Sequence, residues 1–313
     1  MKNIYDVTVI GSGCAGYAAA MYSGRFQLKT LVLGDNPGGT ITLTNVVENY
    51  PGFIRLTGEE LATKLKEHAL DYKDFVEIKQ ERVTKVKKFG KAFRVYINKK
   101  FYDTKTIIFA TGTKHRELGI PGEKEFTGHG VHTCTLCDGY FYKNKIVAVI
   151  GGSDSAAKEA LLLTQWAKKV YIIYRGEQIH PEPINMQRVE QLIKKGKIGI
   201  ISNTNVKEII GNKVVTSVIL DKAYRGKNEF KLDGVFIEVG SLPQSELAKK
   251  LGVKLNEKGE IIIDRMSKTN VTGIFAAGDI VDTAFKQAIT GVGEAVSAAY
   301  SAYGYITERY NRK

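Results

Sequence analysis

A chain of 313 residues has room for about two domains, because single domains usually run from about 100 to 200 residues. Its hydrophobic share of 43% and charged share of 25% are ordinary for a globular protein and exclude general disorder. The formal net charge of +13 favours acidic partners. Because the lysines are scattered along the chain, they fit a solubilising surface, and no nucleic-acid partner is predicted.

Three observations bear on the compartment. No apolar run approaches the roughly 18 residues of a membrane span, so no membrane association is predicted. The strand-like segment Tyr5–Ile10 begins close to the first Met and leaves no space for a signal peptide, which predicts a cytoplasmic protein. Three cysteines, Cys14, Cys134 and Cys137, are too few for a disulfide scaffold, and the Cys-x-x-Cys pair is typical of redox or metal chemistry in reducing compartments.

The first chemical motif follows an apolar strand at Val7–Ile10. It reads Gly11-Ser12-Gly13-Cys14-Ala15-Gly16 and leads into a helical stretch, Tyr17–Gly24, and a second strand, Thr30–Leu33. In such a β-α-β unit the first glycine permits a tight turn and the second lets the backbone approach a pyrophosphate at the helix N-terminus. Because a strand precedes the motif and a helix follows it, nucleotide binding is predicted here.

The same pattern returns about 140 positions later. The strand Ile146–Ile150 meets Gly151-Gly152-Ser153-Asp154-Ser155-Ala156, a helix is expected over 158–167, and a strand over Val170–Tyr174. The chain is therefore predicted to contain two nucleotide-binding domains.

The remaining segments complete an α/β organisation. Antiparallel meanders are predicted over Phe75–Phe101 and over 206–240, strands over 106–112, Glu260–Asp264 and 273–277, and a final helix over Lys286–Tyr310. Hinges are predicted near 114–118 and 240–245, so the second domain is expected to be inserted into the first.

The Cys134-Thr135-Leu136-Cys137-Asp138 segment lies just before the second motif. Two cysteines at this spacing can close a small disulfide ring, and the Asp138 carboxylate can move the proton that thiol exchange releases. Zinc is the alternative, with His129, His132, Cys134 and Cys137 as four ligands. Structural zinc sites usually combine two separated ligand pairs, which favours the redox interpretation.

These motifs together resemble the low-molecular-weight, flavin-dependent thioredoxin reductases over essentially the whole chain. The matching stretches are 11–16, 38–40 with 47–53, 110–112, 134–139, 151–156, 276–279 and 286–288. The resemblance implies two Rossmann-like, three-layer ββα domains. An FAD-binding domain would be formed by 1–116 and 242–313, and an NAD(P)-binding-like domain carrying the dithiol would span 117–241.

The resemblance also implies the site residues. Those carried over to FAD are Gly11, Ser12, Gly13, Cys14, Ala15, Gly16, Gly34, Asp35, Gly38, Gly39, Thr40, Asn49, Ala110, Thr111, Gly112, Gly278, Asp279, Lys286, Gln287 and Ala288. Those carried over to a nicotinamide cofactor are Gly151, Gly152, Ser153, Asp154, Ser155, Ala156, Tyr174 and Arg175, and the catalytic set is Cys134, Cys137 and Asp138. Cys14 stands where the family commonly has proline and is expected to be a buried apolar residue without a redox role.

The implied activity is two-electron transfer from NADPH or NADH, through FAD, to the Cys134–Cys137 disulfide and on to a thioredoxin or a glutaredoxin-like protein. A homodimer is also implied. A hypothesis from another class is an FAD-binding regulatory protein whose Cys-x-x-Cys pair holds zinc.

Several residues depart from the family pattern. Ser153 replaces the second motif glycine, and Tyr174-Arg175-Gly176-Glu177 replaces the His-Arg-Arg run that binds the 2′-phosphate of NADPH. Lys286 replaces the more usual arginine and lacks its bidentate fork. Glu177 would repel a 2′-phosphate, so a weak preference for NADPH is predicted, with ferredoxin as an alternative donor.

Overall fold

The computed structural model describes residues 4–310, and the chain divides into two compact units. Unit 1 comprises Met1–Lys114 with Leu242–Lys313, and unit 2 comprises His115–Ser241. The sequence placed the two crossings after residues 116 and 241. Two short strands at the crossings, β7 (Thr113–His115) and β16 (Ser241–Pro243), pair with each other.

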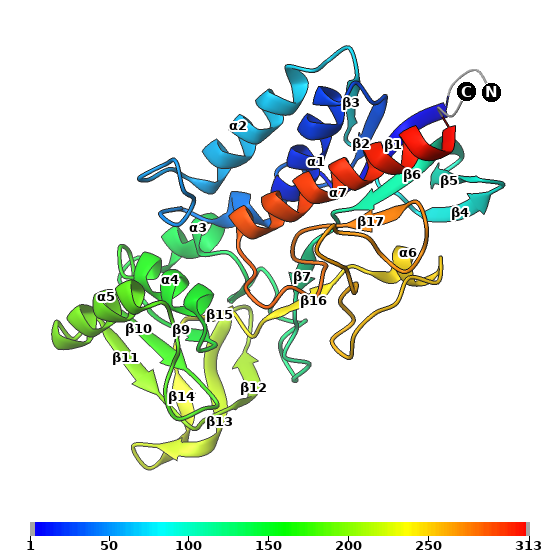
Figure 1. Cartoon of the computed structure of the whole chain (residues 1–313). Coiled ribbons are helices and arrows are strands. Elements are labelled where there is room, and N and C mark those ends of the chain that lie inside the picture. Colours follow the sequence, from blue (N-terminus) through cyan, green and yellow to red (C-terminus); the bar gives the residue numbers. More distant parts are fainter. Residues whose placement is uncertain (1–3, 311–313) are drawn as a thin grey trace. The chain divides into compact units, whose positions relative to one another are not determined.

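Unit 1 is built on a seven-stranded sheet in the order β3-β2-β1-β6-β5-β4, with β17 also paired to β6 (Figure 1). The strands are β1 (Ile4–Ile10), β2 (Thr30–Leu33), β3 (Val76–Lys79), β4 (Lys85–Phe89), β5 (Ala92–Ile97), β6 (Lys100–Phe109) and β17 (Ile274–Ala276). Strands β3, β2, β1, β6 and β17 are parallel, and β4 and β5 form an antiparallel extension. Strands β2 and β17 and the carboxyl-terminal halves of β1 and β6 are buried on both faces, as a covered sheet requires.

Helices cover one face of this sheet. They are α1 (Cys14–Arg25), α2 (Gly58–Leu70) and α7 (Ala288–Tyr310), and α1 lies against α7 (Figure 1). Alanines of both helices are fully buried at their contact, which lets the backbones approach closely. The other face is covered by β4, β5 and the segment around α6 (Glu246–Lys249), which share a second apolar cluster.

Unit 2 has a five-stranded parallel sheet in the order β11-β10-β9-β15-β8. Its strands are β8 (Val131–His132), β9 (Ile146–Ile150), β10 (Lys169–Ile173), β11 (Ile198–Ile201) and β15 (Gly234–Ile237). Helices α4 (Asp154–Leu163) and α5 (Pro183–Lys194) pack on one face, and the antiparallel strands β12 (Val206–Gly211), β13 (Val215–Tyr224) and β14 (Lys227–Lys231) pack on the other. The predicted α/β class with parallel, helix-covered sheets is therefore confirmed.

Four predicted elements differ in the structure. The first strand of the Phe75–Phe101 meander, β3, joins the parallel sheet beside β2, and β15 likewise leaves the second meander for the parallel sheet. The helix predicted over 158–167 is α4, which begins four residues earlier, at Asp154. The strand predicted at Glu260–Asp264 does not form, because Ile261 and Ile262 bond in turn to Ile280 and to Lys254 and make only single bridges.

No helix in the described part of the chain combines the length and the apolar character that crossing a bilayer requires.

Candidate active site

The first glycine-rich turn links β1 to α1 in unit 1. Gly11 has a φ of +119°, and a Cβ there would lie 2.0 Å from the carbonyl oxygen of Ala110, so only glycine fits. Gly16 is equally restricted, because its Cβ would lie 2.0 Å from the oxygen of Gly11. Gly13 caps α1 without a side chain, which leaves the first N–H groups of the helix open to a ligand.

A cavity of about 810 Å³ lies over this turn, entirely within unit 1. Eighteen of the twenty residues predicted at FAD line it: Gly11, Ser12, Gly13, Cys14, Ala15, Gly34, Asp35, Gly38, Gly39, Thr40, Ala110, Thr111, Gly112, Gly278, Asp279, Lys286, Gln287 and Ala288. Gly16 and Asn49 do not line it, but the Asn49 amide donates a hydrogen bond of 2.9 Å to Gln287.

The cavity also has walls that the sequence did not predict. These residues include Arg82, Thr84, Lys114, Gln244 and Glu246. Gln244 donates hydrogen bonds to the backbone oxygens of Gly112 and Thr111, which joins the segment after β16 to the end of β6. Nothing in the local pattern of these residues marks them, because they reach the cavity only through the pairing of distant segments.

The ammonium group of Lys286 at the cavity wall is already bound to other groups of unit 1. Its Nζ lies 3.0 Å from Oε1 of Glu260 and donates to the backbone oxygens of Asp279 and Val281. Burial raises the pKa of the Asp279 carboxyl, and the charge of Lys286 opposes that rise. Lys286 therefore holds the Gly278–Asp279 turn in place at the cavity wall.

Cys14 is the free cysteine of the described residues and is buried. Burial raises the pKa of its thiol to about 12, so the thiol stays protonated and unreactive at neutral pH.

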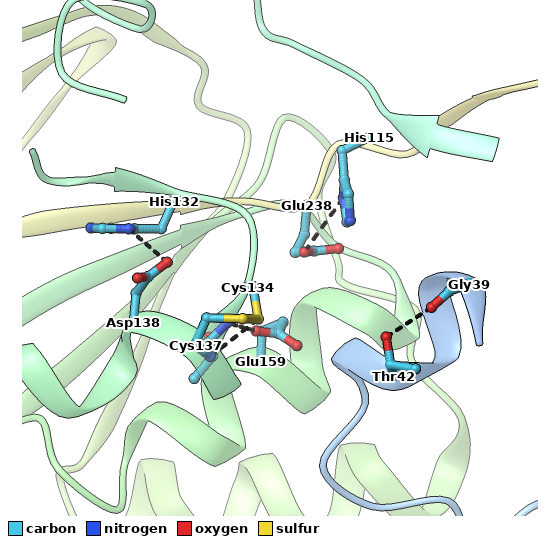
Figure 2. The surroundings of a disulfide bond; sticks show 10 residues. Gly39, Thr42, His115, His132, Cys134, Cys137, Asp138, Glu159 and Glu238 are labelled. Atoms are coloured by element: carbon cyan, nitrogen blue, oxygen red, sulfur yellow. Dashed lines mark hydrogen bonds and ion pairs between the residues drawn. A yellow bond between two sulfur atoms is a disulfide. The ribbon is translucent and has the colours of Figure 1, made fainter. Parts of the chain in front are cut away.

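Unit 2 carries the other two cysteines in a disulfide at the start of the short helix α3 (Thr135–Asp138) (Figure 2). The Cα atoms of Cys134 and Cys137 lie 5.4 Å apart, and the N–H of Cys137 donates to Sγ of Cys134 at 3.1 Å. Glu159 of α4 accepts a hydrogen bond of 2.8 Å from the N–H of Thr135, which fixes the turn between the cysteines to the helix beneath it.

Asp138, the third predicted catalytic residue, points at His132 (Figure 2). Its Oδ2 lies 2.9 Å from Nδ1 of His132. His132 and Cys134 were also proposed as zinc ligands, but the sulfurs are bonded to each other and His132 is bonded to Asp138. Within residues 4–310 no group of three or more His, Cys, Asp and Glu side chains is arranged to hold a metal ion.

A buried acidic pair lies near the disulfide. Burial and then the neighbouring Glu159 raise the pKa of Glu238 to about 8, and burial raises the pKa of Glu159 as well. Oε1 of Glu238 is 3.9 Å from Nδ1 of His115, whose own pKa burial lowers (Figure 2). This pair is not visible in the sequence, because nothing in the local pattern shows that Glu159 and Glu238 come together.

The second glycine-rich turn follows β9. The residues predicted at a nicotinamide cofactor lie at the carboxyl ends of β9 and β10: Gly151, Gly152, Ser153, Asp154, Ser155, Ala156, Tyr174 and Arg175. The Tyr174 ring lies directly on this turn, since a Cβ on Gly152 would come within 2.5 Å of it. His180 stays beside the ring, with its N–H donating to Gly152 O at 2.8 Å.

Comparisons with known proteins agree along the whole chain. The family model "Pyridine nucleotide-disulphide oxidoreductase" matches residues 5–298. A thioredoxin reductase of Bacillus subtilis (strain 168) is 39% identical, with 98% of this chain and 96% of the relative covered.

Two solved structures are similar in fold as well as in sequence. The thioredoxin reductase of Lactococcus lactis is 40% identical with a TM-score of 0.91, covering 97% of this chain and 99% of the other. The thioredoxin reductase of T. acidophilum is 37% identical with a TM-score of 0.89 and the same coverage. The chain therefore belongs to the pyridine nucleotide-disulphide oxidoreductase family, in its branch of low-molecular-weight thioredoxin reductases.

Proposed function

We propose that this chain is an FAD-dependent disulfide reductase in which two electrons pass from a reduced donor, by way of FAD, to the Cys134–Cys137 disulfide and on to a thioredoxin. The observation that carries this proposal is the Cys-x-x-Cys disulfide in a chain that also has a glycine-lined cavity. The test is turnover: the protein loaded with FAD should reduce oxidised thioredoxin, and a yellow protein that leaves thioredoxin oxidised would contradict the proposal.

The cavity of unit 1 is a suitable FAD site. Gly13 and Gly39 expose backbone without a side chain at the cavity wall, and the free N–H groups at the start of α1 suit a pyrophosphate. Asp279, from the C-terminal part of the chain, also lines the cavity. When bound, FAD would supply the chemistry of accepting and passing on an electron pair. The protein residues would bind it, orient it and exclude water from it.

The dithiol would carry the electrons to the protein substrate by thiol–disulfide exchange. One thiolate of the reduced pair attacks the substrate disulfide, and the second sulfur then releases the substrate by closing the Cys134–Cys137 bond again. Asp138 follows Cys137 directly, so it is the candidate group to supply and take up protons at the sulfurs.

The surface beside the disulfide supports a protein substrate. Tyr140 and Phe141 follow α3 and are 66% and 73% exposed, and Leu136 between the cysteines is 42% exposed. Exposed aromatic side chains next to a reactive centre are typical of protein docking sites. We propose thioredoxin as the partner and a glutaredoxin-like protein as the second candidate.

Three features at the carboxyl edge of the unit 2 sheet should weaken dinucleotide binding. Ser153 has a Cβ where a pyrophosphate would approach, the Tyr174 ring covers Gly152, and Glu177 adds a negative charge. We therefore propose that NADPH has little advantage over NADH. Reduced ferredoxin, an acidic carrier that suits a net charge of +13, is the next donor to test.

The donor is found by anaerobic titration of the oxidised protein with NADPH, NADH and reduced ferredoxin while the flavin absorbance is followed. Rapid bleaching by low NADPH and much slower bleaching by NADH would contradict the proposed weak preference. A ferredoxin-driven rate should fall as salt rises, because opposite charges bring the two proteins together.

A homodimer through the helices of unit 1 is the proposed assembly. Phe26 after α1 stacks on Tyr303 of α7 with ring centres 5.0 Å apart, and the neighbouring Tyr300 is 55% exposed. Light scattering should give about twice the chain mass of 34.6 kDa, and a monomer at micromolar concentration would contradict this assembly. Because thiol reduction requires a reducing compartment, we propose a cytoplasmic location.

A further inference from the structure

His132 has one hydrogen-bond partner on each side of its ring. Nδ1 lies 2.9 Å from Oδ2 of Asp138, and Nε2 lies 2.7 Å from the hydroxyl of Tyr142. The three side chains come from β8, from α3 and from η2 (Gly139–Tyr142), and all belong to unit 2. Figure 2 shows the Asp138 carboxylate directed at the imidazole.

The ring is held firmly in this position. The His132 side chain is only 7% exposed, and it stacks on Phe236 of β15 with ring centres 5.3 Å apart at 28°. Tyr142 meets it edge-on at 5.5 Å. Both ring nitrogens are hydrogen-bonded, as burial of an imidazole requires, and one of the two partners, Asp138, is the residue that follows Cys137.

The environment sets the positions of the protons. Burial lowers the pKa of His132, and the Asp138 carboxylate opposes that effect, so the ring is neutral near pH 7. Burial, and then the charges of Asp138 and Asp233, raise the pKa of Tyr142 to about 12, so its hydroxyl keeps its proton. Asp233 is itself paired with Lys145 at 3.3 Å.

These states give one consistent chain of hydrogen bonds. Tyr142 donates its O–H to Nε2, which leaves the single ring hydrogen on Nδ1 to be donated to the Asp138 carboxylate. If a proton is added, the imidazole can hold it at Nε2 while Tyr142 turns to accept, or it can pass the Nδ1 proton to Asp138.

An ordinary aspartate serves poorly as an acid at neutral pH. A carboxylate accepts a proton only well below neutral pH, whereas a neutral imidazole such as that of His132 is the more basic group. Through its hydrogen bond to Asp138, the imidazole gives the pair a base that can take up one proton and pass it on.

We propose that His132 and Asp138 form one acid–base unit for the Cys134–Cys137 dithiol, in which Asp138 exchanges the proton with sulfur and His132 positions Asp138 and stores the proton. This inference rests on the proposed function. It assigns His132 as a positioning residue and keeps Asp138 as the proposed proton donor and acceptor for the sulfurs.

The proton balance of the exchange is closed. A thiolate of the dithiol attacks one sulfur of the substrate disulfide, so a mixed disulfide forms and a substrate thiolate leaves. That thiolate takes the proton of the unit. The remaining thiol of the pair then gives its proton to the unit and attacks the mixed disulfide as a thiolate. This attack closes the Cys134–Cys137 bond and releases the second substrate sulfur as a thiolate, which takes that proton from the unit.

The test follows one turnover of chemically reduced protein, so that the donor plays no part. Two substrates are compared: oxidised thioredoxin, whose leaving thiolate needs a proton, and 5,5′-dithiobis(2-nitrobenzoate), whose leaving thiolate is stable without one. His132→Asn is the main variant, because its amide still donates to Asp138 from the place of Nδ1 but cannot take up a proton. His129→Gln, at an exposed histidine of the same segment, is the matched control.

At neutral pH, His132→Asn should slow thioredoxin reduction roughly tenfold and change the aromatic disulfide rate less than about twofold. Its rate with thioredoxin should recover as the pH falls, whereas the His129→Gln protein should follow the unmodified protein throughout. Equal losses with both substrates, or an unchanged pH profile in His132→Asn, would overturn the shared-proton unit. Failure of the unmodified reduced protein to reduce either disulfide would instead contradict the proposed function itself.

Discussion

The side-chain amide of Asn49 donates a hydrogen bond of 2.9 Å to Oε1 of Gln287, across 238 positions of sequence. Gln287 lines the cavity of unit 1 and Asn49 does not, so Asn49 acts on the cavity by orienting Gln287. Asn49→Ala should weaken FAD binding about fivefold, since one neutral hydrogen bond contributes about 1 kcal/mol. Calorimetry of FAD binding to the apoprotein measures this affinity, and an unchanged affinity would show that Asn49 does not support FAD binding.

Gly13 offers a sharper test of the FAD site. A Cβ added there meets Gly38 O at 3.6 Å and the Cα of Gly39 at 3.7 Å, which are ordinary contacts, so Gly13→Ala should fold normally. The new methyl group would stand where the pyrophosphate approaches the backbone, and FAD affinity should fall about tenfold or more, ~1.4 kcal/mol. Gly293→Ala, in α7 and clear of other atoms, is the control and should bind FAD normally. Equal affinity of the two variants would place FAD elsewhere.

Tyr174 and Ser153 should both weaken the binding of dinucleotides. Tyr174→Ala removes the ring that covers Gly152, and Ser153→Gly removes the Cβ from the turn, so each should increase the affinity for NADH and NADPH alike by about tenfold. Tyr174→Phe keeps the ring and should behave as the unmodified protein. Anaerobic flavin bleaching by NADH and by NADPH measures both affinities. If neither variant gains affinity, Tyr174 and Ser153 do not restrict dinucleotide binding.

Charge should act separately on the choice between the two dinucleotides. Glu177→Gln removes a negative charge that repels only the 2′-phosphate, so it should increase the affinity for NADPH and leave the affinity for NADH unchanged. An arginine at Gly176 needs a second change, because a Cβ there would lie 2.6 Å from Cε1 of Tyr174. Gly176→Arg is therefore best made together with Tyr174→Ala.

Glu238 should make stability depend on pH in a defined direction. Its pKa is about 8 in the folded protein and about 4.5 when unfolded, so the unfolded chain loses this proton first. Stability should therefore fall as the pH rises from about 4.5 to 8, by on the order of 1.4 kcal/mol for each pH unit, and then level off.

The neutral variant Glu238→Gln should be more stable than the unmodified protein at pH 8 and equal to it near pH 4. Glu229→Gln, at an exposed glutamate of β14, should show no such difference. Denaturant unfolding at the two pH values measures both variants. A Glu238→Gln protein that is less stable at pH 8 would show that the carboxylate is ionised and paired in the folded state.

The sequence was most informative where the structure is local. The turn at Gly11 needs a positive φ, and that requirement is visible in the motif itself because strand and helix flank it. Parallel pairing was harder to predict. Strand β3 alternates like a meander strand, but it pairs with β2 in a register that joins Val76 to Thr30, 46 positions earlier. Alternation shows only which face of a strand is buried and does not identify its partner.

Contacts between side chains that are distant in the sequence could not be predicted from the sequence. The imidazole of His132 was considered as a zinc ligand, and its bonds to Asp138 and Tyr142 depend on how α3 and η2 fold back on β8. Glu238 and Glu159 are 79 positions apart, and their coupling arises only once β15 and α4 pack in one unit. Local pattern carries no information about either arrangement.

The central claim is that electrons reach Cys134–Cys137 through a flavin in the same chain, and an anaerobic dithionite titration of the FAD-loaded protein tests it most directly. The unmodified protein should accept about two electron pairs per flavin, one for the flavin and one for the disulfide. Cys134→Ser and Cys137→Ser should each accept about one pair, keep a reducible flavin and fail to reduce thioredoxin. Cys14→Ala should match the unmodified protein, because that thiol is buried and protonated. One pair per flavin in the unmodified protein, or thioredoxin turnover by either serine variant, would contradict the claim.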